Sequence, residues 1–359
     1  MAAGPTLAPI TAVQAMTPAF ERAKQQLFQP FRFSRWWRLA LTSLLAGELG
    51  SGGNWGRLGD FRKSSGKSDE FFFLAAPPWG NWHDYLPVIV AAVISALLLM
   101  VILIYVSSVF RFILLDSVLR ERVRIREGWR RWQDPGGRFF LWQIGFATIT
   151  ITLLGMVFGL PLFYAWRAGM FKTPGEHVGA LVLGGLLMFF VGGLLVVAGA
   201  LVGVFTKDFV VPLMALEELN AMDAWRRLLP MLQSDKSSYA GYIGMKIVLA
   251  IAAGILFGIL GLIVLIVVLI PLMIAGIVLG VVATALGLTW NPITIVLGVL
   301  VGAALLFCLF WLMAMVSVPS VVFFQWYTLH FFGSRYARLG AVLAPPAPPA
   351  PPAAVPAPA

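Results

Sequence analysis

Residues 240–288 form an apolar stretch of about 49 residues in which Lys246 is the only charged side chain. As one helix this stretch would be about 73 Å long, more than twice the roughly 30 Å of hydrocarbon in a bilayer. Gly loosens a helix and Pro removes a backbone hydrogen bond, and both occur at Gly258, Gly261 and Pro271. We therefore predict two membrane spans here, joined by a fold-back near these residues.

Composition supports a membrane protein. The chain is 60% hydrophobic and 12% charged, whereas soluble domains carry about 25% charged residues. Its net charge is +10, but the basic residues stand beside apolar runs, as expected from the excess of Lys and Arg on the cytoplasmic side of membrane proteins. We expect no nucleic-acid partner.

Four further stretches are long enough to cross a bilayer as a helix: residues 86–108, 139–163, 178–205 and 293–318. With the two spans above, six crossings result. The predicted fold class is an all-α, polytopic transmembrane helical bundle with about six to seven spans and amphipathic juxtamembrane helices.

A seventh span is arguable at residues 36–49. This stretch has only about 14 residues, fewer than the roughly 20 needed to cross the hydrocarbon, and it contains Arg38 and Glu48. Residues 109–138 hold eight Arg and belong with the basic N-terminus on the cytoplasmic side, so something between the two must cross. We favour a short span, with a re-entrant element as the alternative.

The predicted organisation has three parts. Residues 1–34 form a cytoplasmic N-terminal segment, and residues 35–332 form the transmembrane domain, with an extracytoplasmic loop at 50–85. Residues 333–359 form a disordered tail, because its Pro and Ala favour extended polyproline II over a packed core. Its side of the membrane is left open.

Glycines recur at helical intervals within the apolar stretches. GxxxG pairs occur at 155/159, 199/203, 254/258, 276/280 and 298/302. Such spacing lets helix backbones approach closely in lipid. We predict close packing between helices of the same chain, with dimerisation as the alternative.

Two juxtamembrane segments look like an internal repeat. Residues 125–131 (IREGWRR) and 221–227 (AMDAWRR) share an acidic residue, a small residue, Trp and two Arg. Residues 115–132 place apolar side chains on one helical face, as expected of a helix lying in the membrane interface. The candidate headgroup-binding residues are Trp129, Arg130, Arg131, Trp225, Arg226 and Arg227. The alternative role for these arginines is to set topology.

Catalytic and metal-binding patterns are sparse. His83, His177 and His330 are far apart, and none has metal-ligand spacing to another ligating residue. No nucleotide-binding or hydrolase motif occurs. We predict no catalytic residue, no cofactor, no metal and no enzyme.

The same segments carry a resemblance to a known group. It rests on residues 27–31 with Trp36, 110–131, 208–212 leading into 224–227, and 324–327. These resemble a broad bacterial group of uncharacterised multi-span proteins, which is similar to the membrane domain attached to some glycerophosphoryl diester phosphodiesterases. The resemblance implies a bacterial inner (cytoplasmic) membrane location. The catalytic domain of those enzymes, with paired His and acidic metal ligands, has no counterpart here, so the resemblance implies no activity.

Two functions are expected as alternatives. One is a non-enzymatic membrane module that binds membrane lipids, anionic ones among them, or another membrane protein. The other is a permease or channel-like transporter of an uncharged or zwitterionic solute. A polar-lined opening deep in the bilayer would favour transport, and tight packing through the glycine faces would favour the binding module.

Overall fold

A computed structural model describes residues 9–29, 31–48, 82–285, 287 and 292–343 of the chain. The regular elements among them are helices, and five of these are long and apolar enough to cross a membrane. The chain is a multi-pass membrane protein with an all-α helical fold, which confirms the predicted fold class.

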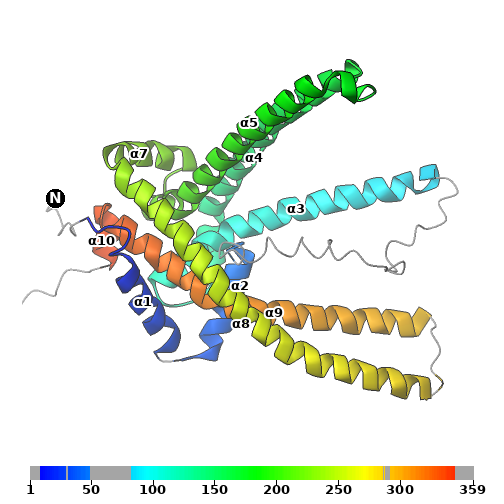
Figure 1. The fold of residues 1–359 in the computed structure, drawn as a ribbon. Helices are drawn as coiled ribbons and strands as arrows, with labels where there is room; N and C mark the ends of the chain where they lie inside the picture. The colour runs from blue at the N-terminus through cyan, green and yellow to red at the C-terminus, as the bar shows by residue number, and fades with distance from the viewer. Residues whose placement is uncertain (1–8, 30, 49–81, 286, 288–291, 344–359) are drawn as a thin grey trace, which may run out of the picture.

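The long helices meet at one end and separate toward the other (Figure 1). They are α3 (Trp82–Leu119), α4 (Ile125–Arg167), α5 (Val178–Phe205), α8 (Lys236–Ala285) and α9 (Pro292–Gly333). The shorter elements are α1 (Met16–Phe28), α2 (Phe33–Leu45), η2 (Pro174–Glu176), η3 (Thr206–Val210), α6 (Val211–Glu217), α7 (Ala221–Ser234) and α10 (Ala337–Leu343).

We call the packed end the hub. It consists of α1, α2, η3, α6, α7 and α10 with the long-helix ends at Leu119, Ile125, Phe205, Lys236 and Gly333. The remaining lengths of α3, α4, α5, α8 and α9 are the spread spans. In Figure 1, α4 lies beside α5 and α8 runs with α9, whereas α3 packs against α4 at the hub and separates from both pairs farther along its length.

Helix α1 belongs to the hub because, from its N-cap Ala15 onward, one face carries three alanines and a leucine at every fourth position. Ala15, Ala19, Ala23 and Leu27 are all buried, and α1 packs against α9. This spacing repeats on one side of a helix, so the two backbones can approach closely. The N-terminal segment predicted at 1–34 is therefore part of the folded core from α1 onward.

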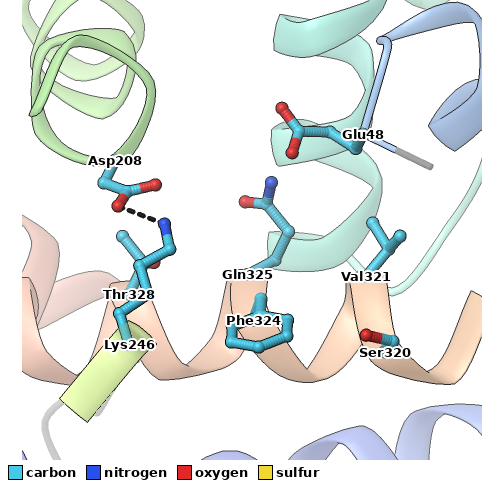
Figure 2. Close-up of a pocket in the computed structure, with 8 residues that line it drawn as sticks. All are labelled: Glu48, Asp208, Lys246, Ser320, Val321, Phe324, Gln325 and Thr328. Carbon is cyan, nitrogen blue, oxygen red and sulfur yellow. Dashed lines mark hydrogen bonds and ion pairs between the residues drawn. The ribbon is translucent and has the colours of Figure 1, made fainter. Parts of the chain in front are cut away.

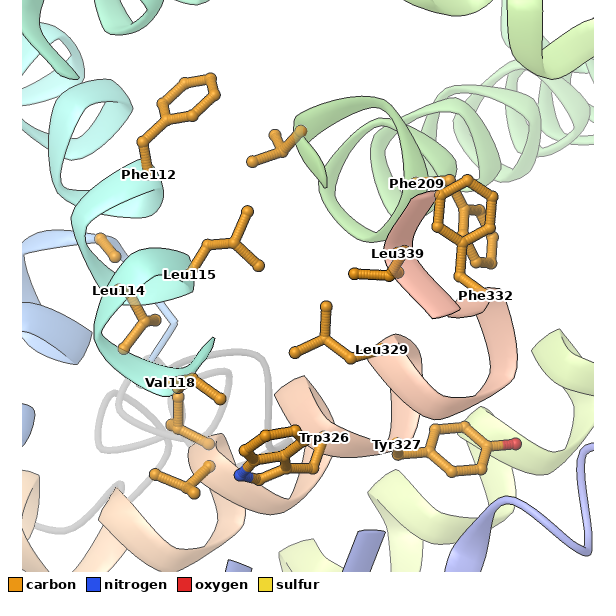
Figure 3. Packing of buried hydrophobic residues seen from close by; sticks show 14 of the residues in the cluster. Phe112, Leu114, Leu115, Val118, Phe209, Trp326, Tyr327, Leu329, Phe332 and Leu339 are labelled. Carbon is orange, nitrogen blue, oxygen red and sulfur yellow. The ribbon is translucent and has the colours of Figure 1, made fainter. Parts of the chain in front are cut away.

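Aliphatic and aromatic side chains pack together in the hub, among them Leu329, Leu339, Phe209 and Phe332 (Figure 3). The rings of Phe209 and Phe332 have centroids 5.1 Å apart, and those of Tyr242 and Phe331 are 4.6 Å apart. All four side chains are fully buried, and they come from η3, α8 and α9. Three segments distant in sequence are thus held together by one aromatic cluster.

Helix α8 runs without a break from Lys236 to Ala285, so the predicted fold-back is wrong. Pro271 lies inside the helix, as is tolerated in membrane helices whose surroundings satisfy the freed backbone groups. Part of the apolar stretch also packs on protein, because Tyr242, like Tyr239 just before the stretch, is buried in the hub. The described residues therefore contain five helices able to span, where we had predicted six to seven.

Helix α2 replaces the predicted short span. It has 13 residues, which as an α-helix reach about 20 Å, too short for the hydrocarbon layer. Leu39 and Ala40 are fully buried, and α2 packs against α3 and α9. A short helix buried in the hub thus takes the place of a lipid-facing crossing.

Two predicted boundaries change or stay open. Helix α10 occupies Ala337–Leu343 and buries Leu339, so the predicted tail begins later than residue 333. Residues 344–359 of that tail and residues 50–81 of the predicted loop lie outside the described residues. The predicted sides of the membrane stay predictions.

Most of the predicted glycine contacts between spans are absent from the described structure. A Cβ added at any of seven of these glycines would meet no atom within 4 Å: residues 155, 159, 203, 276, 280, 298 and 302. Close approaches occur instead at Gly192, which faces the Phe158 ring, and at Gly136 in the hub, where a Cβ would lie 2.9 Å from the Val109 Cα. Helix packing in this chain is concentrated at the hub.

Candidate functional site

A cluster of charged side chains lies where the spread spans enter the hub. Its members come from four separate parts of the chain: Glu48, Arg111, Lys207, Asp208 and Lys246. The three cations and two carboxylates are buried or half-buried. We call these five residues the ionic cluster.

Asp208 organises one half of the ionic cluster. Its Oδ2 atom pairs with the Nζ atom of Lys246 and accepts a hydrogen bond of 2.9 Å from the Tyr242 hydroxyl. The same hydroxyl lies 2.7 Å from the Thr328 hydroxyl. Removing a charge from water is costly unless it is paired and hydrogen-bonded, and this carboxylate has both kinds of partner.

A π-helical turn brings two charges into the cluster. Thr206–Val210 form η3 between α5 and α6 in one continuous helical segment. The wider turn buries Asp208, while Lys207 is half-buried with its Nζ atom 3.6 Å from Glu48 Oε1. Single π turns of this kind often occur at functional sites.

Glu48 organises the other half. The Nε atom of Arg111 lies 3.4 Å from Glu48 Oε1, and another guanidinium nitrogen of Arg111 donates to the Ala46 carbonyl at 3.2 Å. Burial alone would raise the pKa of Glu48, but the positive charges of Lys207 and Arg111 outweigh it and lower this pKa below its ordinary value. The carboxylate is held ionised by its cationic neighbours.

A small polar cavity adjoins the ionic cluster (Figure 2). Its volume is ≈ 20 Å³, and Glu48, Asp208 and Lys246 line it together with Gln325 and Thr328. This is room for about one water molecule. The cavity is therefore too small to admit a solute in this conformation.

Residues of the ionic cluster were not among the predicted site residues. Glu48 stood out in the sequence only as an obstacle to a short span, and Lys246 only as the single charge in a long apolar stretch. The available signal was the presence of ionisable residues at the ends of apolar stretches, where they are expensive to keep. Their pairing across the fold is not visible in the sequence.

A second candidate site is a surface rich in arginine. It is formed by α2 and the turn between α3 and α4, and we call it the arginine face: Arg32, Arg35, Arg38, Arg120, Arg122, Arg124 and Arg131. The carboxylates among the residues lining its two cavities are Asp116, Glu121 and Glu127. The cavities have volumes of ≈ 490 and ≈ 250 Å³.

Some of these arginines are neutralised locally and others are not. Arg120 lies 2.7 Å from Asp116, and Arg124 lies 2.9 Å from Glu127. Within the described part of the chain, the other five form no ion pair: Arg32, Arg35, Arg38, Arg122 and Arg131. The arginine face therefore keeps an excess of positive charge available to an anion.

The two repeated segments have the same local structure. Each begins a helix after a turn with a left-handed glutamate, at Glu121 (φ 53°) and Glu218 (φ 56°). The small residue before each Trp is buried, since a Cβ at Gly128 would lie 3.2 Å from Ile113, and Ala224 is fully enclosed. The shared small residue is thus required by close packing of the helix on its neighbour.

The predicted interfacial helix at 115–132 is not one helix. α3 ends at Leu119 and α4 begins at Ile125, so a turn divides the segment. The matching apolar spacing came from two helices that pack on the same core. Helix α7, by contrast, is a separate amphipathic helix with Ala221 and Leu228 buried.

The predicted headgroup-binding residues fall into three groups. Trp129 is half-buried against the rings of Tyr105 and Phe110, and Trp225 is also half-buried. Arg130 and Arg131 are exposed.

The two arginines on α7 have carboxylate partners. Arg226 lies 3.4 Å from Asp223, and Arg227 lies 2.9 Å from Glu217. The Tyr336 hydroxyl also donates to Glu217, and burial followed by this bond raises the pKa of Tyr336. Lipid binding by these residues stays a prediction, and Arg227 has a structural partner as well.

Comparisons with known proteins give one match. The chain matches a family of unknown function (DUF7544) over residues 10–342. No curated protein and no solved structure matches the chain. Among the described residues, no group of three or more His, Cys, Asp or Glu side chains could hold a metal ion. Because the family model covers nearly the whole chain, this multi-pass membrane protein belongs to DUF7544, a family of unknown function.

Proposed function

We propose that the protein is a non-enzymatic module of the bacterial cytoplasmic membrane whose arginine face binds anionic lipid headgroups. In this arrangement the hub lies on the cytoplasmic side. The excess of Lys and Arg on that side of membrane proteins supports the orientation, because the arginine-rich turn between α3 and α4 belongs to the hub. The bacterial location is part of the proposal and rests on the motif resemblance at residues 110–131 and 208–212 alone.

The observation that carries the proposal is the unneutralised charge of the arginine face. Arg32, Arg122 and Arg131 have no carboxylate partner among the described residues, and they line open cavities beside α2 and the α3–α4 turn. A guanidinium matches a phosphate through paired hydrogen bonds. Each basic residue near an anionic membrane surface contributes about 1 kcal/mol to binding.

The ion pairing of the arginines favours the first repeated segment over the second for the proposed role. Arg226 and Arg227 on α7 are paired with Asp223 and Glu217. Arg131 has no such partner and belongs to the arginine face. We therefore place headgroup binding at the first repeat rather than at both.

Lipid enrichment tests this assignment. The protein is reconstituted into nanodiscs of mixed phosphatidylglycerol and phosphatidylcholine, extracted in mild detergent, and the retained lipids are quantified by mass spectrometry. A variant with Arg32, Arg122 and Arg131 changed to Gln should bind phosphatidylglycerol at the arginine face about a hundredfold more weakly, from about 1 kcal/mol per residue. The matched control changes Arg226 and Arg227 to Gln and should retain most of the enrichment.

Two results would contradict the proposal. Equal enrichment in the native chain and the first variant would show that the arginine face does not select headgroups. Loss of enrichment only in the α7 variant would move the site to α7.

The ionic cluster supports transport as a second candidate function. Ionisable residues at membrane depth are retained where they serve a pathway or relay, and this cluster gathers five of them. Uptake of a radiolabelled zwitterion such as betaine into proteoliposomes tests it. Uptake that is lost in Asp208→Asn would support transport, and uptake equal to that of empty liposomes would oppose it.

A further inference from the structure

An apolar groove runs between α1 and α8, with α9 as its floor. Its volume is ≈ 550 Å³, within the range of small-molecule sites. Ala23 and Phe28 line it from α1, Ala253 and Phe257 from α8, and Pro319 from α9. We call it the α1–α8 groove.

Small side chains account for the width of the groove. Ala23 on α1 and Ala253 on α8 leave space between the two helices above α9. Larger side chains at Phe28 and Phe257 enclose it. Short side chains thus line the groove on both α1 and α8.

The groove adjoins surface that lipid covers. Ile251, Ile255 and Leu256 of α8 are 60%, 61% and 63% exposed, and they begin the apolar face of a helix long enough to span the membrane. Water in a concave apolar site is unfavourable compared with hydrocarbon. The chemistry of the lining therefore suits an acyl chain.

One charged residue lines the groove. Lys24 lies on α1 one helical turn from Phe20 and from Phe28, all three of which are lining residues. Its side chain is exposed and has no ion pair among the described residues. A cation without a partner beside an apolar channel complements an amphiphile with an anionic head.

We infer that the α1–α8 groove binds one acyl chain of an anionic phospholipid, with the lipid phosphate beside Lys24. This site is separate from the arginine face, which is formed by α2 and the α3–α4 turn. It goes beyond the proposed function, since it concerns a seated lipid molecule rather than a surface preference for headgroups.

Photolabelling tests the site. The native chain is reconstituted in nanodiscs of phosphatidylcholine that contain a small fraction of phosphatidylglycerol with a diazirine on one acyl chain, and labelled peptides are mapped by mass spectrometry. We expect labels concentrated on the groove walls in α1 and α8. Ala253→Trp fills the groove and should abolish this labelling, whereas Ala275→Trp, a matched change on an exposed position of the same helix, should not.

A second variant keeps the test independent of folding. Lys24→Gln changes an exposed side chain and should weaken labelling of the groove by phosphatidylglycerol about fivefold, to the level of a phosphatidylcholine probe. Lys236→Gln, the same change at an exposed position in the hub, should leave it unchanged.

Several outcomes would overturn the inference. Labels spread over all exposed apolar faces would show that the groove holds no particular chain. Equal labelling by the two lipids, together with no effect of Lys24→Gln, would show that the groove does not recognise an anionic headgroup. The arginine-face triple variant should keep the groove label, so its loss there would show that the two sites are not separate. If the native chain shows no phosphatidylglycerol enrichment at the arginine face but the groove is still labelled, only the proposed function is contradicted.

Discussion

The hub and the spread spans use the same kinds of apolar side chain for opposite purposes. In α9, Phe307 is 64% exposed, whereas Phe331 and Phe332, farther along the same helix, are fully buried. Apolar surface in lipid needs no protein partner, because lipid tails are as apolar as the side chains themselves. Apolar surface in the hub is buried against protein, so the hub is where the fold gains its packing energy.

The two regions differ in their charges as well. The ionic cluster and the arginine face belong to the hub or its border, and the spread spans expose apolar residues such as Leu97, Ile151 and Ile277. Burying charges costs desolvation free energy, which is offset only if the charged groups are held in a well-paired geometry. We infer that substitutions in the hub alter stability strongly and that matched substitutions in the spread spans do not.

The largest contrast is expected within α9. Phe332→Ala should lower the free energy of unfolding by about 3–5 kcal/mol, because it leaves a cavity in the aromatic cluster. Phe307→Ala should have little effect, since lipid fills the space. Unfolding by denaturing detergent in mixed micelles measures both, and equal losses would contradict the division into hub and spans.

The ionic cluster should give the next largest effect. Asp208→Asn leaves the half-buried Lys246 without its ion-pair partner and should cost about 3 kcal/mol. The double variant Asp208→Asn with Lys246→Met removes both charges and should recover much of that loss. A double-mutant cycle on unfolding free energies checks the coupling, and additive losses would show that the two side chains act independently.

Glycine substitutions should also affect stability differently in the hub and in the spread spans, by smaller amounts. Gly136→Ala places a Cβ 2.9 Å from the Val109 Cα and should destabilise the protein by about 1–3 kcal/mol. Gly145→Ala, in the same helix, meets no atom within 4 Å and should be neutral. Unfolding midpoints of the two variants decide the matter, and a neutral Gly136→Ala would mean that α3 and α4 are less closely packed.

The pH dependence of stability at Glu48 should be the smallest effect, and it appears only in acid. Its pKa in the folded protein is lowered from the ordinary value of 4.5, so its ionised form stabilises the fold fully above that value. This contribution is lost as the pH falls through the lowered pKa. The stability difference between the native chain and Glu48→Gln should therefore be constant at neutral pH and shrink below pH 4.5. A difference that shrinks already near neutral pH would contradict a lowered pKa.

The sequence correctly predicted features that depend on contact with lipid, and it failed for features that depend on contacts between distant parts of the protein. It identified apolar stretches within all five long helices. The bilayer requires each span to be long and apolar, and both properties can be recognised within one segment of the sequence. It divided α8 near Gly258, Gly261 and Pro271 because it assigned the whole stretch to lipid, whereas the first turns of α8 pack in the hub. It assigned the glycines to helix contacts that seven of them do not make.

The candidate sites show the same division. The sequence singled out Arg130 and Arg131 and the repeat that contains them, since Trp and Arg near a span are a local signal. It could not foresee that Arg227 pairs with Glu217 or that Lys24 lines a groove with Ala253. Both depend on helices that are distant in sequence.

The sequence by itself determined that this chain is a helical, multi-pass membrane protein with basic juxtamembrane turns, because the bilayer imposes length, apolarity and charge on each segment separately. Only the tertiary structure decided that the long helices are joined mainly at one end, that Glu48, Arg111, Lys207, Asp208 and Lys246 meet there, and that an apolar groove opens beside Lys24. The reason is physical. Lipid acts on every residue alike, whereas pairing and packing depend on which distant side chains the fold brings within a few ångströms.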